Sequence, residues 1–324
     1  MSAVRRSVSE AFWAMCAADS MSMPVHWYYN IQDIRRDFGG WISGFNTPAD
    51  RHPSSILSLS NTAGSGRSAW STGAKRADVV GNIILHEKLE LWRSSNGSVH
   101  YHQGAENSKC LQAGDNTLNI LCSLRVARTI VSRRFTDVSQ PDARAAVLSD
   151  YVQFLTTPGS HADTYAESFH RSFFADWQDS RPTSPSEVSA AVEFVKLTHP
   201  HPNVPEYVKI YSRALHAVLG GGSVRQQAEY ALRRLEVWDT CQSYSYKASR
   251  FPASSEERLK VHQSAVNQLG LACYNRGENC NRGSALGALL GAGAAYNGGG
   301  IPQEWKDELR AAQELLPDIL KKML

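Results

Sequence analysis

The chain has 324 residues, a formal net charge of +3 and 42% hydrophobic residues. It is long enough to bury a sizeable core, and its charges are too evenly mixed to suggest binding to nucleic acid or to an anionic membrane surface. No stretch of about 18 uninterrupted apolar residues occurs, which argues against a membrane-spanning helix.

Apolar residues recur at helical spacing along most of the chain, and the alternation typical of strands is absent. We therefore expect an all-α fold, a single compact multi-helical domain over residues 1–324. The expected helices span residues 5–18, 76–93, 115–131, 141–155, 163–175, 186–198, 204–219, 223–238, 255–273, 282–296 and 303–322. Two stretches, 28–75 and 95–113, are expected to form long loops; the longer of them, near the N-terminus, contains Gly39, Gly40, Pro48 and Pro53.

The six cysteines are scattered and form no C-x-x-C pair. This spacing favours reduced thiols over a disulfide framework. The first 20 residues lack the apolar core of a signal peptide, because Ser7, Ser9 and Glu10 interrupt it. We therefore expect a cytoplasmic protein.

Residues 114–117, with the sequence Gly-Asp-Asn-Thr, open one of the expected helices. Asp, Asn and Thr are ordinary N-cap residues, so capping explains them without a ligand. Their side chains also carry carboxylate, amide and hydroxyl oxygens, which suit Mg²⁺. Both interpretations stay open at this point.

A similar polar run, Glu-Asn-Cys-Asn at residues 278–281, precedes the helix expected at 282–296. Glu278 could cap the amino end of that helix, or the run could line a ligand site. If the two amino ends are neighbours, Asp115, Asn116 and Glu278 converge on one place.

Gly283, Gly287 and Gly291 follow this second polar run. Each interior helix Gly costs about 1 kcal/mol relative to Ala. A spacing of four places the three along one stripe, which lets a neighbouring backbone approach closely, and the resulting contacts can offset the cost. We therefore expect this helix to be central and surrounded.

A third polar segment, Asp-Thr-Tyr at residues 163–165, begins the helix expected at 163–175. Asp163 is interpreted as the N-cap of that helix. A ligand-facing role for Asp163 or Tyr165 is the alternative.

Three separated segments resemble motifs of the ADP-ribosylglycohydrolase superfamily, which includes the J1-type crystallins. They are "AADSMSMPVHW" (17–27), "GDNTLNILCSL" (114–124) and "RGENCNRGSALGALLGA" (276–292), the last followed by "IPQEW". The family's versions are Gly-Asp-Ala-Leu-Gly-x-Pro-x-Glu, Thr-Asp-Asp-Thr-x-Met and Gly-Gly-Asp-Thr-Asp-Thr with its Gly/Ala helix. The resemblance implies an all-helical domain whose cleft holds two Mg²⁺ ions and hydrolyses N- or O-glycosidic bonds of ADP-ribose conjugates.

The first two motifs depart from the family's pattern when they are matched residue by residue. Asp19 is retained, but His26 stands where the opening motif has its acidic residue. The Thr-Asp-Asp trio matches Gly114, Asp115 and Asn116, so one hydroxyl is lost and one carboxylate becomes an amide.

The third motif also departs, because its two Asp match Glu278 and Cys280 and its Thr matches Asn281. Only Asp115 and Glu278 are carboxylates among the matched ligand positions, too few for two buried divalent ions. We therefore expect at most one weakly bound Mg²⁺ ion, or none. Glu167 and Asp163 are carboxylates that could compensate, although nothing in the sequence places them at the site.

The expected site residues, taken from the resemblance and from the polar runs at the helix starts, can be stated by role. The expected residues are, as metal ligands, Asp115, Asn116, Glu278 and Asn281; as catalytic residues, Glu278 and Asp115; and as substrate-binding residues, Asp19, His26, Asp163, Tyr165 and Asn279.

The favoured function is a hydrolase of ADP-ribosyl bonds with a divergent metal site, acting on a small-molecule or ADP-ribosylated protein substrate. One alternative is a catalytically inactive relative, either crystallin-like or a binder of an ADP-ribose-type ligand, because carboxylates are lost at 26, 116 and 280. Another is a hydrolase of the same fold that works without the usual two-metal centre. The oligomeric state is left open.

Overall fold

The computed structural model describes residues 2–28, 30–40, 42–49, 81–86, 111–138, 140–167, 170, 173–174, 204–234 and 279–324. Within these ranges the chain is helical and has no strand, as predicted for an all-α fold. The helices are α1 (Ala3–Ser22), η1 (Met23–Val25), α2 (Ile31–Phe38), η4 (Gly81–Leu85), α5 (Leu118–Ser132), α6 (Pro141–Thr156), α9 (Val204–Leu219), α10 (Val224–Arg234), α14 (Asn279–Tyr296), α15 (Gln303–Glu308) and α16 (Arg310–Met323).

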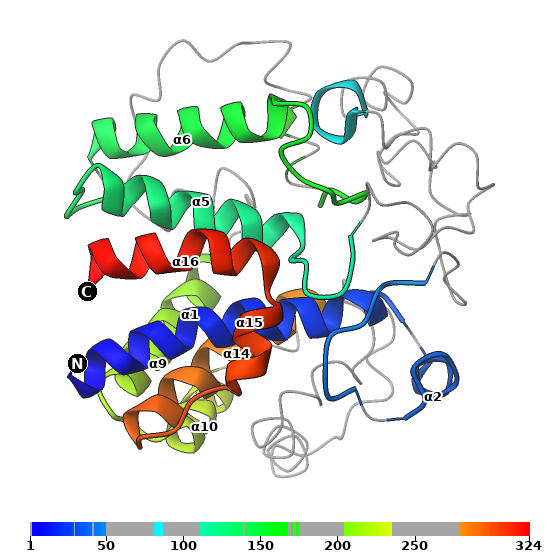
Figure 1. The fold of residues 1–324 in the computed structure, drawn as a ribbon. Helices are drawn as coiled ribbons and strands as arrows, with labels where there is room; N and C mark the ends of the chain where they lie inside the picture. The colour runs from blue at the N-terminus through cyan, green and yellow to red at the C-terminus, as the bar shows by residue number, and fades with distance from the viewer. Residues whose placement is uncertain are drawn as a thin grey trace.

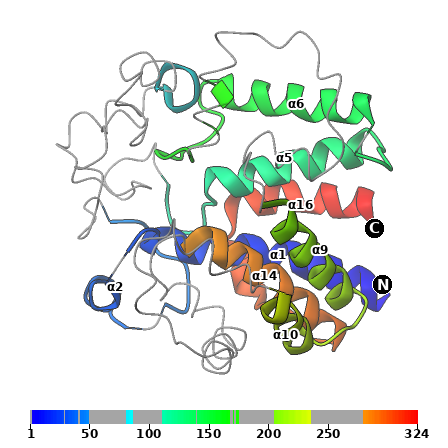
Figure 2. The same ribbon diagram turned by 180° about the vertical axis from the view of Figure 1, so that it is seen from behind.

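Helix α1 lies at the centre of the described helices. On one side α16 packs against it, α5 packs on α16, and α6 packs on α5 (Figure 1). On the other side α14 runs along it, and α9 and α10 cover α14 (Figure 2). Both chain termini lie at one end of these helices, and the amino ends of α5 and α14 lie at the other end.

The glycines of α14 face α1, which confirms the close approach predicted from their spacing. A Cβ atom built on Gly287 would lie under 3.0 Å from the carbonyl oxygen of Ala14, and one on Gly291 equally close to that of Glu10. Gly283 faces Ala18 in the same way. The α1 backbone therefore occupies the space that side chains at these three positions would need.

A hydrophobic core fills the space between α1, α5 and α16. Trp13, Ile120 and Leu316 belong to this core, and Leu316 is completely buried. Because α1 is buried on its α14 side and on this side, its residues are small or apolar over most of its length. This arrangement fixes the position of the carboxyl end of α1, where Asp19 lies.

Helix α2 interrupts the loop that was expected over residues 28–75. The Asn30 side chain accepts a hydrogen bond from the Gln32 N–H at 3.0 Å, and Gly39 ends the helix with φ of 73°. Ile34 is its one buried residue. Ile31 and Phe38 also pack against the same core cluster. A helix of only two turns is too short for this spacing to stand out within a long stretch that contains Gly and Pro, which is why the sequence pattern missed it.

Residues 161–167 are not helical, so the expected start of a helix at Asp163 is wrong. The expected helix at 303–322 is divided in two at Leu309. The Arg310 N–H donates to the carbonyl oxygen of Gly114 at 3.1 Å instead of continuing the helical ladder. The helices expected at 186–198 and 255–273 lie outside the described residues.

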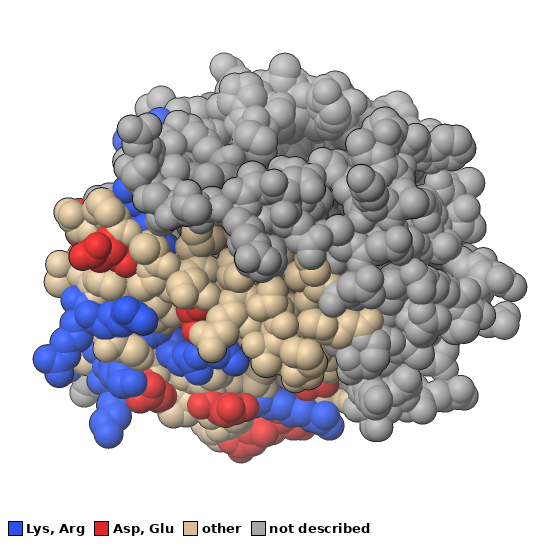
Figure 3. Space-filling view, turned by 90° about the horizontal axis from the view of Figure 1, so that it is seen from above, with Lys and Arg blue, Asp and Glu red and all other residues tan. Residues whose placement is uncertain are grey.

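Within the described residues, no helix is both long enough and apolar enough to cross a membrane. Basic and acidic side chains lie next to one another on the described part of the face in Figure 3.

Cys16 and Cys122 are buried free thiols, and burial raises the pKa of both. Neither thiol is therefore present as a reactive thiolate near neutral pH.

Candidate functional site

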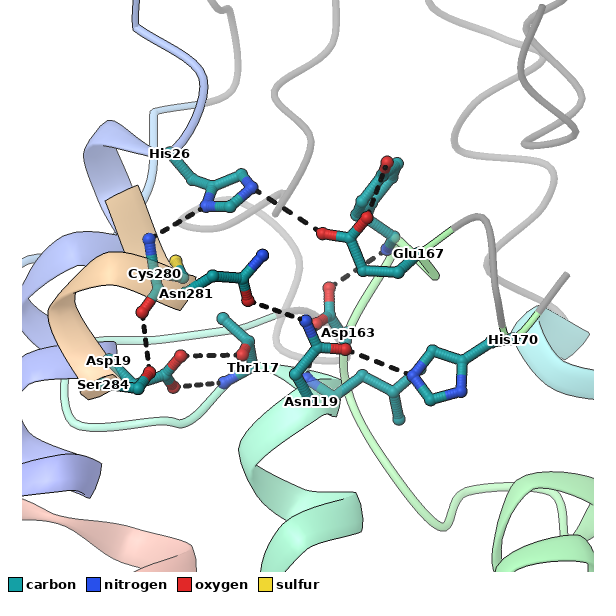
Figure 4. A network of polar contacts seen from close by, with 12 residues as sticks. Asp19, His26, Thr117, Asn119, Asp163, Glu167, His170, Cys280, Asn281 and Ser284 are labelled. Atoms are coloured by element: carbon teal, nitrogen blue, oxygen red, sulfur yellow. Dashed lines mark hydrogen bonds and ion pairs between the residues drawn. The ribbon is translucent and has the colours of Figure 1, made fainter. Parts of the chain in front are cut away.

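The amino ends of α5 and α14 meet, although 160 residues separate them in the sequence. The Asn119 side-chain amide donates to Asn281 Oδ1 at 3.1 Å, which joins the first turns of the two helices (Figure 4). Asn281 is exposed and Asn119 is half-buried. The meeting point therefore lies at the protein surface, where a ligand can reach it.

Two buried carboxylates from other segments hold the amino end of α5. Asp19 of α1 accepts from the Thr117 N–H at 2.8 Å and from the Thr117 hydroxyl at 2.8 Å. Asp163 accepts from the Leu118 N–H at 2.8 Å. Both carboxylates are at most 1% exposed, so the first backbone donors of α5 and its dipole stabilise charges that would otherwise be costly to bury.

Asn116 links the same carboxylate to the α1 backbone. Its side-chain NH₂ donates to Asp19 Oδ2 at 3.0 Å and to the carbonyl oxygen of Cys16 at 2.7 Å. Two acceptors on one side fix the orientation of the amide. Its Oδ1 atom is buried and has no hydrogen-bond partner among the described residues.

Asp115 faces away from this group, toward the start of α16. Its carboxylate accepts from the Gln112 N–H at 2.8 Å and lies 3.8 Å from the Arg310 guanidinium. Burial raises the pKa of Asp115, although the Gln112 N–H and Arg310 act in the opposite direction. Asp115 closes a turn before α5, and its hydrogen bond and ion pair within the described residues, to Gln112 and Arg310, reach no other expected site residue.

Gly114 explains why the chain has no threonine at this position of the motif. Its φ is +84°, a conformation that side chains disfavour, and a Cβ atom there would lie under 3.0 Å from the carbonyl oxygen of Glu308. The missing hydroxyl is therefore a consequence of how closely this turn packs against the end of α15.

An imidazole holds the amino end of α14. The Cys280 N–H donates to His26 Nδ1 at 3.2 Å, so the proton of the neutral ring is on Nε2. His26 is 1% exposed. Asn279, which is also buried, donates to the carbonyl oxygen of Val25 at 2.6 Å and accepts from Arg282 at 2.6 Å.

Glu167 lies on the other side of His26. Its Oε1 atom is 4.0 Å from His26 Nε2, and its Oε2 atom is 3.5 Å from the Tyr165 hydroxyl. The backbone N–H of Tyr165 donates to Asp163 at 3.0 Å. Asp163 therefore connects the amino end of α5 to the segment that carries Glu167 (Figure 4).

A buried histidine, His170, orients the side chain of Asn119. His170 Nε2 is 3.1 Å from Asn119 Oδ1, and His170 Nδ1 is 2.6 Å from the Tyr151 hydroxyl. Because the Asn119 NH₂ group donates to Asn281, its Oδ1 must accept from His170 Nε2–H. Nδ1 then accepts from Tyr151, whose pKa is raised by burial, so the tyrosine keeps its proton.

The structure thus brings all five expected substrate-binding residues to one place. Asp19, His26, Asp163, Tyr165 and Asn279 all contact the amino ends of α5 and α14 or the segment beside them. Glu278 lies outside the described residues, and its catalytic and metal-binding roles stay predictions.

Sequence reasoning missed three contributors, Asn119, His170 and Tyr151. Asn119 follows Asn116 by three residues on the polar side of a helix start, which is a usable signal. The two aromatic side chains carry no such signal, because they reach the site only through the fold.

The described donor groups do not fit a centre of two Mg²⁺ ions. The carboxylates of Asp19 and Asp163 accept hydrogen bonds from α5, Asp115 faces Arg310, and Asn116 turns its NH₂ group to Asp19. The buried Asn116 Oδ1, which has no hydrogen-bond partner within the described residues, is a neutral oxygen of the kind that can coordinate a single ion. Within the described ranges, no three His, Cys, Asp or Glu side chains gather to hold a metal.

Comparison with known proteins gives the same assignment as the three sequence motifs. A family model described as ADP-ribosylglycohydrolase matches residues 1–324. No curated protein matches the chain. Because the match covers the whole sequence, the chain belongs to the ADP-ribosylglycohydrolase family.

Proposed function

We propose that this protein hydrolyses an N- or O-glycosidic bond that joins ADP-ribose to a protein side chain or a small molecule. The observation that carries the proposal is the meeting of two helix amino ends, joined by Asn119 and Asn281 at 3.1 Å. The first N–H groups of α5 already donate to Asp19 and Asp163, so a ligand at this surface meets the amide side chains of the two helix ends. Amides both donate and accept hydrogen bonds, which suits an ADP-ribose conjugate of the kind that the family membership suggests.

The exposed amides provide the contacts to the sugar. Asn281 and Asn119 each offer both a donor and an acceptor to ribose hydroxyl groups. Glu278, one residue before α14, is the proposed acid that protonates the departing group on that side. Asp19 and Asp163 act by holding α5 in position, since their oxygens accept its backbone hydrogen bonds.

A divalent ion has a minor place in this proposal. The donor groups support at most one Mg²⁺ ion, near Asn116 Oδ1, and such an ion would polarise a ribose oxygen. Buried thiols and the sequence pattern support a cytoplasmic location as part of the same proposal.

The direct test is the release of ADP-ribose from peptides ADP-ribosylated on Arg or on Ser. The wild-type chain should release ADP-ribose from at least one of them, and Glu278→Gln should lower kcat by about 100-fold or more. Glu304→Gln, an exposed residue of α15, is the matched control and should change nothing. Absence of release from both peptides, with correctly folded protein, contradicts the proposal.

A second candidate is a relative that binds ADP-ribose without hydrolysing it. The amide of Asn116 favours it, because this position of the motif donates to Asp19 instead of offering a carboxylate. Thermal melting separates the candidates from a protein that binds nothing, since a ligand at 100 times its Kd adds about 2.7 kcal/mol. A melting shift with ADP-ribose, combined with inactivity on both peptides, would identify the binding relative.

A further inference from the structure

We propose that Glu167 is the general base of the reaction and that His26 positions it. This inference rests on the proposed hydrolysis and names a residue that the family motifs do not assign. It is carried by three described residues, Glu167, His26 and Tyr165, and by the contacts that hold them.

The imidazole of His26 presents an N–H group toward Glu167. Its Nδ1 atom accepts the Cys280 N–H at 3.2 Å, so its Nε2–H is directed away from α14. Glu167 Oε1 lies 4.0 Å from that nitrogen. The first turn of α14 thereby fixes both the tautomer and the orientation of the ring that faces Glu167.

The second oxygen of Glu167 is held by another segment. The Tyr165 hydroxyl lies 3.5 Å from Oε2, and the Tyr165 backbone is fixed by Asp163. Asp163 is fully buried and also caps α5. The two oxygens of Glu167 therefore face two groups, His26 and Tyr165, that are held by the helix amino ends of the proposed ADP-ribose site.

The carboxylate remains accessible to water. The Glu167 side chain is 14% exposed, whereas those of Asp19 and Asp163 are at most 1% exposed. A base must reach a water molecule, which the two buried carboxylates cannot do. The position of His26 in the opening motif has lost its acidic residue, and Glu167 supplies a carboxylate beside the imidazole that replaced it.

The chemical step balances without a co-reactant. A water oxygen forms a bond to the anomeric carbon of the ribose while the bond from that carbon to the departing nitrogen or oxygen breaks. Glu167 takes one proton from the water. The departing atom leaves with the electron pair and takes a proton from Glu278, the acid of the proposed function. The proton on Glu167 then returns to Glu278 through solvent, and free ADP-ribose is released.

The test compares the wild-type full-length chain with Glu167→Gln on the ADP-ribosylated peptides. The variant should lose at least 100-fold in kcat, and its melting temperature should still rise with ADP-ribose as much as that of the wild type. Glu314→Gln, an exposed residue of α16, is the matched control. Activity of Glu167→Gln within 10-fold of an active wild type overturns this inference and leaves the proposed function standing, whereas an inactive wild type overturns both.

The His26 variants test positioning and do not depend on the folding of Glu167→Gln. His26→Ala should lower kcat with little change in KM. His26→Gln, whose amide can both accept from Cys280 and donate to Glu167, should restore most of the activity. Equal kcat values for His26→Ala and the wild type would contradict the positioning role, and loss of activity that His26→Gln fails to restore would do the same.

Discussion

At the scale of single residues, Asn116 shows how one change of functional group alters a site. Its two donated hydrogen bonds, to Asp19 and to the Cys16 carbonyl, require an NH₂ group. A carboxylate in the same position would place its oxygens against two acceptors, one of them charged. The residue that weakens the metal pattern is thus the one that stabilises the buried Asp19.

Restoring the family's carboxylate should therefore destabilise the protein. We expect Asn116→Asp to lower the free energy of unfolding by about 3 kcal/mol at pH 7, because two hydrogen bonds become repulsive contacts. Repulsion raises the pKa of the new carboxyl in the folded state, so the penalty grows as pH rises above about 4 and shrinks below it.

Urea unfolding at pH 4 and pH 7 measures this difference. Asn30→Asp is the matched control, because Asn30 uses only its oxygen, as the cap of α2, and should stay within about 0.5 kcal/mol of the wild type. Equal stability of Asn116→Asp and the wild type at pH 7 would show that the amide does not hold Asp19 as described.

Some residues of this site can be identified from the sequence alone. Asp19, His26 and Asn279 are recognisable because they lie in the motifs. The role of Asp163 is not, because a carboxylate that caps another helix has the same local sequence signature as one that caps its own. Asp163 accepts from the N–H of Leu118, which is 45 residues away in the sequence, and only the packed fold reveals that contact.

At the scale of elements, the pairing of α1 with α14 positions the amino end of α14. Three glycines and the facing alanines of α1 allow the two backbones to come together. Periodicity was enough to predict this contact, because a stripe of glycines has few other physical explanations in a soluble helix. It could not name α1 as the partner.

Adding a methyl group to this interface should separate the helices. We expect Gly287→Ala to lower the free energy of unfolding by about 2 kcal/mol, because steric strain exceeds the gain of about 1 kcal/mol in helix propensity. Gly44→Ala, where a Cβ atom would meet nothing within 4 Å, should stay within about 0.5 kcal/mol of the wild type. Thermal unfolding measures both, and a stabilised Gly287→Ala would contradict the described packing.

The contact between α9 and α14 should make stability depend on alkaline pH. The Tyr211 hydroxyl donates to the carbonyl oxygen of Ala285 at 3.0 Å, and burial raises the pKa of Tyr211 from about 10 to about 12. The folded state therefore holds the proton more tightly than the unfolded state. The stability that this provides is complete below pH 10 and is lost as pH rises through about 12.

Between pH 9 and pH 11, Tyr211 should account for a loss of about 1 kcal/mol. Tyr211→Phe lacks the ionising group, so its stability should fall by that much less over the same range. Denaturant unfolding at the two pH values checks this expectation. Parallel decreases in wild type and variant would mean that Tyr211 is not buried against α14.

At the scale of the whole molecule, the helices have two distinct ends. The chain termini lie at one end, and α1 finishes at the other, beside the beginnings of α5 and α14 (Figure 1). The family match over residues 1–324 and the all-helical architecture agree with the sequence prediction. The meeting of the amino ends of α5 and α14 could only be stated as a condition from the sequence, since spacing along a chain does not determine which helix ends become neighbours.

The measurement that tests this account most directly is hydrogen–deuterium exchange with and without ADP-ribose. We predict that ADP-ribose slows exchange in peptides covering residues 116–121 and 279–284 together, because one ligand contacts both amino ends. Peptides from the far ends of α5 and α16 should be unchanged. Slower exchange only in helices away from residues 116–121 and 279–284, or no change at a saturating ADP-ribose concentration, would contradict the proposed site.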